Sequence, residues 1–247
     1  MTRLPSKPRT EYFVGEGRAH MQMCLETTFE WCAKNHVSKA VIFTATGDGP
    51  LYAVKNLLPR PDLSGVRVIA VTPPFGRVYR EDPRKKDSPL VRAGIQPAMK
   101  QLLSGFGVPV IAAQLPFKEV HGGQNEQRSS EWTKVSQALS ILGGGFPLCV
   151  QAVLVACDAG EVEPGERVAA LTADTSVIVL SSRTETFLSQ REGLLIEHIL
   201  CRPGRYDISK AEHEWLPRMW RTEIEPSPAG ALTEGDHTAL PDNDGDE

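Results

Sequence analysis

The sequence FTATGDGPLYAVKNL, residues 43–57, joins an extended segment to a helical one through a short polar loop. The apolar run AVIF at 40–43 predicts a buried strand, whereas the apolar residues after Pro50 recur at helical spacing. Proline suits the first turn of a helix, because its missing N–H would have no partner there. A strand that leads through a loop into a helix is the unit from which α/β sheets are built. We therefore expect this loop at the carboxyl end of a core strand.

The loop has the composition of an anion-binding turn. Ligands of open α/β sheets bind beyond the carboxyl ends of the strands, and the N-terminus of a helix favours phosphate. Gly47 and Gly49 would let backbone N–H groups approach a phosphate, and Thr44 and Thr46 would offer hydroxyl donors. Asp48 fits this site if it caps the following helix. The loop matches neither the Walker motif nor GxGxxG, so the alternative is a tight capped turn without a ligand.

Helical and extended patterns alternate along the rest of the chain. Apolar residues at helical spacing predict helices at 21–35, 50–58, 95–106, 130–142, 146–159 and 210–220. Short apolar or β-branched runs predict strands at 40–43, 66–71, 108–112, 166–172, 176–182 and 193–203. The segments 72–89 and 114–129 are rich in Pro, Gly or charge, and we expect long irregular loops there. This order predicts an α/β fold with helices on both faces of the sheet.

The charge distribution divides the chain into a core and a tail. The 247 residues have a net charge of −4, but residues 223–247 carry eight acids and no Lys or Arg, which leaves +4 for the remainder. The tail has few large apolar residues, and such segments stay disordered because they bury too little surface. We expect one α/β domain over 1–222 and an acidic disordered tail over 223–247.

The composition also bears on where the protein is located and on whether it binds membranes or metals. No apolar run approaches the roughly 20 residues that span a bilayer, and no secretory signal follows the first basic residues. The five cysteines form no CxxC pair and read as buried reduced thiols rather than metal ligands. We therefore expect a cytoplasmic protein with no membrane partner and no metal site.

Candidates for catalysis are few. His121, in the polar segment EVHGGQ, could act as a general acid or base, or it could be an exposed loop histidine. The basic run at 77–92 is interrupted by acids and has no interleaved aromatic residue beyond Tyr79, so we expect a solvated loop and no nucleic-acid partner. The catalytic residues, the substrate and the oligomeric state stay open, and a homo-oligomer remains compatible with the sequence.

Four stretches, taken together, resemble a family of stand-alone prokaryotic proteins that are similar to the C-terminal α/β domain of pyruvate kinase. The first is EYFVGEGRAHMQMCLETTFEWCAKNHVSKAVIFTATGDGPLYAVKNL at 11–57, and the second is VIAVTPPFG at 68–76. The third is SILGGGFPLCVQAVLVACDAGEVEPGERVAALTADTSVIVLSSRTETF at 140–187, and the last is EHILCRPGR at 197–205. The resemblance covers about residues 11–206. It lies in the order and spacing of these motifs rather than in any one of them.

The resemblance implies a three-layer α/β/α domain with a mostly parallel sheet and a phosphate-bearing ligand at the exit of the first core strand. Some family members bind FMN, so FMN is the implied cofactor. The positions that match the family's site fall in three segments. They are Thr44, Thr46, Gly47, Asp48 and Gly49 in the first loop, Thr72, Phe75 and Gly76 after the second strand, and Asp174 and Thr175 in the ADT turn.

Two functions follow from this resemblance. One is a flavoprotein, with flavin-dependent redox chemistry on an unknown substrate. The other is a non-catalytic metabolite-sensing or regulatory module, like the effector domain of pyruvate kinase. The chain departs from the family pattern in the stretch before Asp174, which is several residues shorter, and at Gln151, which stands where the family has an acid. The scarcity of acid–base groups favours the module, and the flavin-bound relatives favour the flavoprotein.

Overall fold

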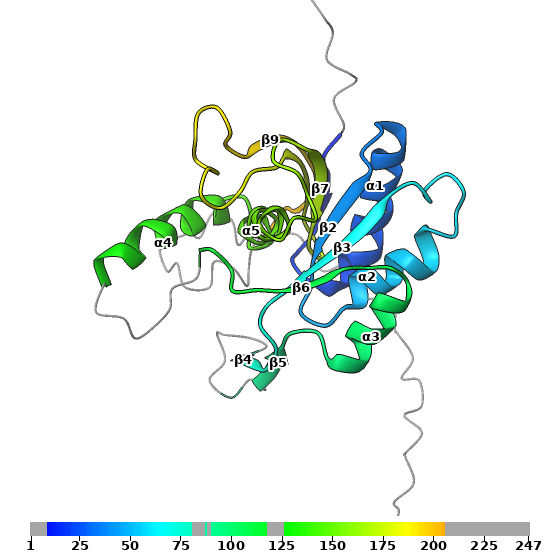
Figure 1. Cartoon of the computed structure of the whole chain (residues 1–247), viewed down its shortest axis with the longest axis horizontal. Helices are drawn as coiled ribbons and strands as arrows, with labels where there is room; N and C mark the ends of the chain where they lie inside the picture. Colours follow the sequence, from blue (N-terminus) through cyan, green and yellow to red (C-terminus); the bar gives the residue numbers. More distant parts are fainter. Residues whose placement is uncertain (1–8, 81–86, 88–89, 118–125, 206–247) are drawn as a thin grey trace, which may run out of the picture. The chain divides into compact units, whose positions relative to one another are not determined.

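The computed structural model describes residues 9–80, 87, 90–117 and 126–205 (Figure 1). All of them belong to one compact unit, Met1–Glu212. The helix expected at 210–220, the tail expected at 223–247 and His121 lie outside the described residues. The fold predicted for the core can therefore be compared with the structure over nearly all of 11–206.

A mostly parallel sheet of seven strands forms the centre of the unit. Its order is β1-β9-β8-β7-β2-β3-β6, and β8 alone among these strands runs antiparallel to its neighbours. The strands are β1 (Glu11–Phe13), β2 (Lys39–Phe43), β3 (Arg67–Thr72), β6 (Val110–Ala112), β7 (Arg167–Leu171), β8 (Ser176–Leu180) and β9 (Leu195–Pro203). This confirms the predicted α/β fold with a mostly parallel sheet.

Helices cover both faces of the sheet (Figure 1). One face packs against α1, α2 and η2 around buried residues such as Phe29 and Leu57, and the other packs against α5 around Phe146 and Val153. The helices are η1 (Arg18–His20), α1 (Met21–Lys34), α2 (Asp48–Tyr52), η2 (Ala53–Leu57), α3 (Pro97–Gly105), α4 (Glu126–Ser140) and α5 (Gly145–Asp158). Strands β2 and β3 are apolar on both faces because each face meets helices.

Two segments that were expected to be irregular contain regular structure. Residues 72–89 were expected to be irregular, but β4 (Arg77–Arg80) lies within this segment and forms an antiparallel hairpin with β5 (Leu90–Ala93), which directly follows it. The two strands form backbone hydrogen bonds with each other. The side-chain pattern of the sequence does not reveal this pairing. The segment 114–129 was also expected to be a loop, yet α4 begins within it, at Glu126.

The path of the chain creates a crevice beside β2. From β2 the chain turns outward to β3 and β6, and it returns through α4 and α5 to place β7 on the other side of β2. The strand order therefore changes direction between β2 and β7, which is where open α/β sheets bind ligands. Strands β1, β2 and β7 are mutually parallel, so their carboxyl ends meet at this one edge.

Within the described part of the chain, no helix combines the length and the apolarity that a membrane span requires.

Candidate functional site

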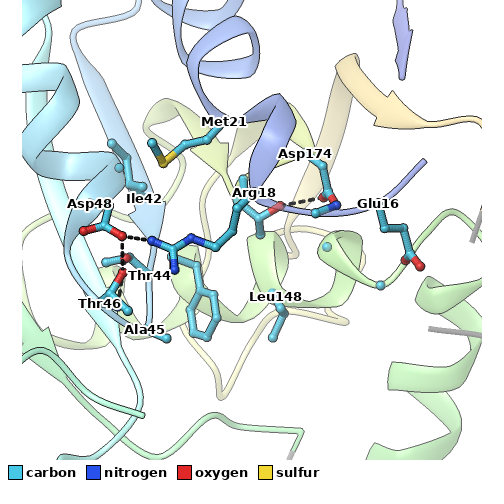
Figure 2. Close-up of a pocket in the computed structure, with 17 residues that line it drawn as sticks. Glu16, Arg18, Met21, Ile42, Thr44, Ala45, Thr46, Asp48, Leu148 and Asp174 are labelled. Atoms are coloured by element: carbon cyan, nitrogen blue, oxygen red, sulfur yellow. Dashed lines mark hydrogen bonds and ion pairs between the residues drawn. The ribbon is translucent and has the colours of Figure 1, made fainter. Parts of the chain in front are cut away.

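A pocket of about 420 Å³ lies at the carboxyl edge of the sheet, between β2 and β7 (Figure 2). Its volume falls in the range of small-molecule sites, roughly 300–1,000 Å³. Four segments form its wall: the loop after β1, the loop after β2, the start of α5 and the turn after β7. The lining residues on which the site depends are Arg18, Phe43, Thr46, Asp48, Gly145, Leu148 and Asp174.

The loop after β2 is closed by its own hydrogen bonds. Gly47 has φ 96°, a conformation that favours glycine, and its N–H donates to Thr44 Oγ1 at 2.9 Å. The N–H of Thr46 points to the same oxygen at 3.4 Å. The sequence predicted the N–H groups of Gly47 and Gly49 as donors to a phosphate, but in the structure Thr44 already accepts that of Gly47. The loop is therefore a preformed turn, and an anion in the pocket would need donors from elsewhere.

Arg18 supplies a cation on the open side of the pocket. Its guanidinium pairs with the Asp48 carboxylate, which also accepts the Thr46 hydroxyl at 2.8 Å (Figure 2). The Arg18 side chain is 70% exposed, and such surface ion pairs contribute only about 0–1 kcal/mol. Turning the guanidinium from Asp48 to an anionic ligand therefore costs little.

The first turn of α5 lies against the turn after β7 and opens into the pocket. A Cβ on Gly145 would lie 2.4 Å from Thr175 Oγ1 and 2.6 Å from Thr172 Oγ1, so only glycine allows this approach. The helix has no side-chain cap, and within the described residues no hydrogen bond uses the N–H of Gly144 or Gly145. Uncapped N–H groups at the start of a 14-residue helix attract anions.

Asp174 joins the loop after β1 to the turn after β7. Its carboxylate accepts the Gly17 N–H at 2.7 Å and the hydroxyls of Thr172 and Thr175 at 3.2 and 3.0 Å. The side chain is buried, and these three donors satisfy most of its hydrogen-bonding capacity. Asp174 thus holds the wall of the pocket in place, and Thr175 lies fully buried behind it.

The residues predicted after the second strand are not in this pocket. Thr72 is buried, and its Oγ1 accepts the N–H of Ile95 at 3.2 Å. Gly76 occupies a turn with φ 85°, and its N–H donates to the Ala93 carbonyl. Phe75 is exposed and lines a second cavity, which meets the first at Ala45 and Thr46. The structure thus brings Thr44, Thr46, Asp48, Gly49 and Asp174 together and leaves Thr72, Phe75 and Gly76 outside.

Sequence reasoning missed Arg18 and the start of α5 as parts of the site. Both had a local signal: Arg18 follows Gly15 and Gly17, and the GGG at 143–145 directly precedes a helix. Only the sheet order, however, places these segments beside the loop after β2.

The described residues that line the pocket include no histidine and no cysteine. No group of three His, Cys, Asp or Glu side chains suited to a metal occurs among the described residues. Cys149, next to the pocket-lining Leu148, is fully buried, and burial raises the pKa of its thiol well above the usual range. Its protonated thiol contacts the Thr175 carbonyl at 3.6 Å.

Comparison of the sequence with protein-family models and with curated proteins finds no match.

Proposed function

We propose that the chain binds a phosphate-bearing small molecule in the pocket between β2 and β7, with FMN as the ligand. The observation that carries this proposal is the combination of one exposed cation, Arg18, with the uncapped start of α5 on the same pocket. Arg18 and the N–H groups of Gly144 and Gly145 offer donors to a phosphate, and the pairing of Arg18 with Asp48 is weak enough to exchange.

The remainder of the pocket suits a flat apolar ring. Met21, Ile42, Phe43 and Leu148 line it beside the polar end. A ligand with an anionic end and an apolar body matches this division. The motif order that resembles the pyruvate kinase C-terminal domain supports the choice of FMN among such ligands.

FMN, when bound, would supply electron or hydride transfer, and the protein would bind and orient it. Arg18 and the start of α5 would hold the phosphate, and the apolar residues would exclude water from the ring. Asp174 would keep the first loop closed over the ligand through its hydrogen bond to Gly17.

A second candidate function is a non-catalytic sensor of a phosphorylated metabolite. One observation favours it: the carboxylates of Asp48 and Asp174 are both engaged in hydrogen bonds or ion pairs, so neither is positioned as a free base. A protein that ignores FMN but is stabilised by sugar phosphates or nucleotides would support the sensor.

The test is a visible absorption spectrum of freshly purified protein, followed by titration of colourless protein with FMN. We expect bands near about 375 and 450 nm or saturable quenching of FMN fluorescence. In the Arg18→Gln variant the FMN dissociation constant should rise about tenfold or more, because a charge-assisted hydrogen bond is lost.

Arg60→Gln is the matched control. Arg60 is likewise an arginine with acidic partners, Glu30 and Asp62, but it lies before β3, at the opposite edge of the sheet. Its substitution should leave FMN affinity unchanged. Absence of FMN binding in the parent protein, or equal losses in the two variants, would reject the flavin proposal.

A further inference from the structure

A second cavity of about 670 Å³ adjoins the first and has a different character. We call it the Phe75 pocket. It lies between the end of the β4–β5 hairpin and the start of α3, and it shares Ala45 and Thr46 with the first pocket. Its other lining residues are Phe75, Arg92, Gly94, Gln96, Ala98, Met99 and Leu102.

The floor of the Phe75 pocket is fixed by close backbone packing. Gly94 has φ 97°, and a Cβ there would lie 2.6 Å from the Phe75 Cα, so the end of β5 passes directly over residue 75. The Gly76 N–H donates to the Ala93 carbonyl, and the Ile95 N–H donates to the buried Thr72 hydroxyl. Phe75 is 57% exposed although its backbone is held in this way. An aromatic ring presented from a fixed backbone loses little entropy when a ligand covers it.

The two pockets are built on common residues. Met99, on α3, lies against the loop after β2, because a Cβ on Gly47 would be 2.6 Å from Met99 Cγ. The loop after β2, which forms one wall of the first pocket, thus also packs against Met99 in the wall of the Phe75 pocket. A ligand in the Phe75 pocket would lie next to a ligand in the first pocket, at Thr46.

Charge and apolarity in the Phe75 pocket point to one class of ligand. Arg92 is the cationic residue of its lining, and no described residue forms a hydrogen bond or ion pair with its guanidinium. Among the described residues, the lining also includes Phe75, Met99 and Leu102 and contains no acidic residue. One guanidinium in an apolar wall matches a single carboxylate on an apolar body, since arginine holds a carboxylate with two parallel hydrogen bonds.

We propose that the Phe75 pocket binds a small carboxylic acid with an apolar or aromatic body, with its carboxylate on Arg92 and its body on Phe75, Met99 and Leu102. The statement that this acid lies beside a bound cofactor rests on the function proposed above. The acid site itself is independent of that function, because none of its charged or aromatic residues belongs to the first pocket.

The test is calorimetric titration of the full-length protein with 3-phenylpropionate and with the neutral 3-phenylpropanol. We expect the acid to bind about tenfold tighter than the alcohol, the effect of one charged hydrogen-bond pair. Arg92→Gln should abolish this preference, and Arg92→Lys should restore part of it because the charge returns without the bidentate geometry. Phe75→Ala should weaken both probes alike, since the ring supplies apolar contact.

Two controls keep the result specific. Arg60→Gln should retain the preference for the acid. Because Arg92 and Phe75 are exposed, their variants should melt at the parent temperature, so a loss of binding would not reflect unfolding. Equal affinity for acid and alcohol in the parent protein, no binding of either, or a preference that survives Arg92→Gln would overturn the acid site.

The same titrations separate this proposal from the flavin proposal. Arg18→Gln should weaken FMN and leave 3-phenylpropionate binding intact, and Arg92→Gln should do the reverse. Arg92-dependent acid binding in a protein that ignores FMN would support the acid site and reject the flavin. Competition between FMN and 3-phenylpropionate for the protein would instead mean that one ligand fills both pockets, which would overturn a separate acid site.

Discussion

At Gly145 a single methyl group would separate two walls of the first pocket. The Cβ of an alanine would lie 2.8 Å or less from three atoms of Thr172 and Thr175, in a region with no free space. We expect Gly145→Ala to lower the free energy of unfolding by about 1–3 kcal/mol, the usual cost of overpacking. FMN affinity should fall as well, because the start of α5 would move away from the turn after β7.

Gly105→Ala is the control for this prediction. It also lies in the terminal turn of a helix, but a Cβ there would meet no atom within 4 Å. This variant should be neutral or stabilised by roughly 0.4–1 kcal/mol. Denaturant unfolding and FMN titration of both variants provide the measurement. If the two behaved alike, close packing at Gly145 would not be what shapes the pocket.

At the residue scale the sequence could predict the turn after β2 but not the partners of its side chains, and Asp48 does not cap α2 as expected. Thr44, Thr46 and Asp48 do come together in one turn, because they are neighbours in the chain and Gly47 permits the turn. What each side chain binds there could not be foreseen. Thr44 accepts backbone N–H groups of its own loop, and Asp48 pairs with Arg18, 30 residues away.

The helix α5 carries apolar residues around its whole circumference. Gln151 is a buried polar residue within it. The side-chain amide accepts the Phe117 N–H at 2.8 Å and donates to the Pro147 carbonyl at 3.0 Å. Glutamate has the same shape, but only its protonated form can both accept and donate here. Burial would raise the folded-state pKa of such a carboxyl group above its unfolded value of about 4.3.

We therefore expect Gln151→Glu to become less stable than the parent protein as the pH rises above about 4.3. The unfolded chain releases its proton first, so stability falls until the pH exceeds the raised folded pKa and then stays low. Melting temperatures of variant and parent at pH 5 and pH 8 measure this difference. Gln137→Glu, at an exposed position of α4, should show no such pH dependence. A constant difference between Gln151→Glu and the parent at both pH values would contradict the prediction.

Elements with strong periodicity could be predicted from the sequence, and those stabilised by pairing could not. The helices α1 and α5 and the strands β2, β3 and β8 match the predicted segments to within a few residues. The hairpin β4–β5 was missed, because each strand has only four residues and the segment between them is rich in Pro and charge, so no periodic pattern stands out. The antiparallel placement of β8 could not be predicted either, because strand sequences do not specify the direction of their neighbours.

At the scale of the whole domain, the reactivity of the five cysteines can be used to measure how often the fold opens. All five are free and buried, as the sequence predicted for structural thiols. Burial raises the pKa of the Cys32 thiol to about 12 and also raises those of Cys24 and Cys149, so their reactive thiolates are scarce near neutral pH.

We expect native protein at pH 7.5 to react with a maleimide more than about a thousandfold more slowly than protein unfolded in guanidinium, which should label at all five positions. The labelling rate of the native protein should then be set by how often the fold opens, and not by the pKa of any one thiol. Mass spectrometry of the labelled protein gives the count. Rapid modification of one thiol in the native state would show that its surroundings are open to solvent.

The hydrogen bond from Gly17 to Asp174 spans 157 positions of the chain, and β1 pairs with β9, the last strand of the sheet. On the ribosome, the loop after β2 emerges early, while its partners on α5 and in the turn after β7 have not yet been translated. The N-terminal strand has no neighbour to pair with until Pro203 has been made. The pocket and its supporting strand can therefore be completed only after Pro203 has been translated, so its ligand can stabilise only nascent chains that extend beyond this residue.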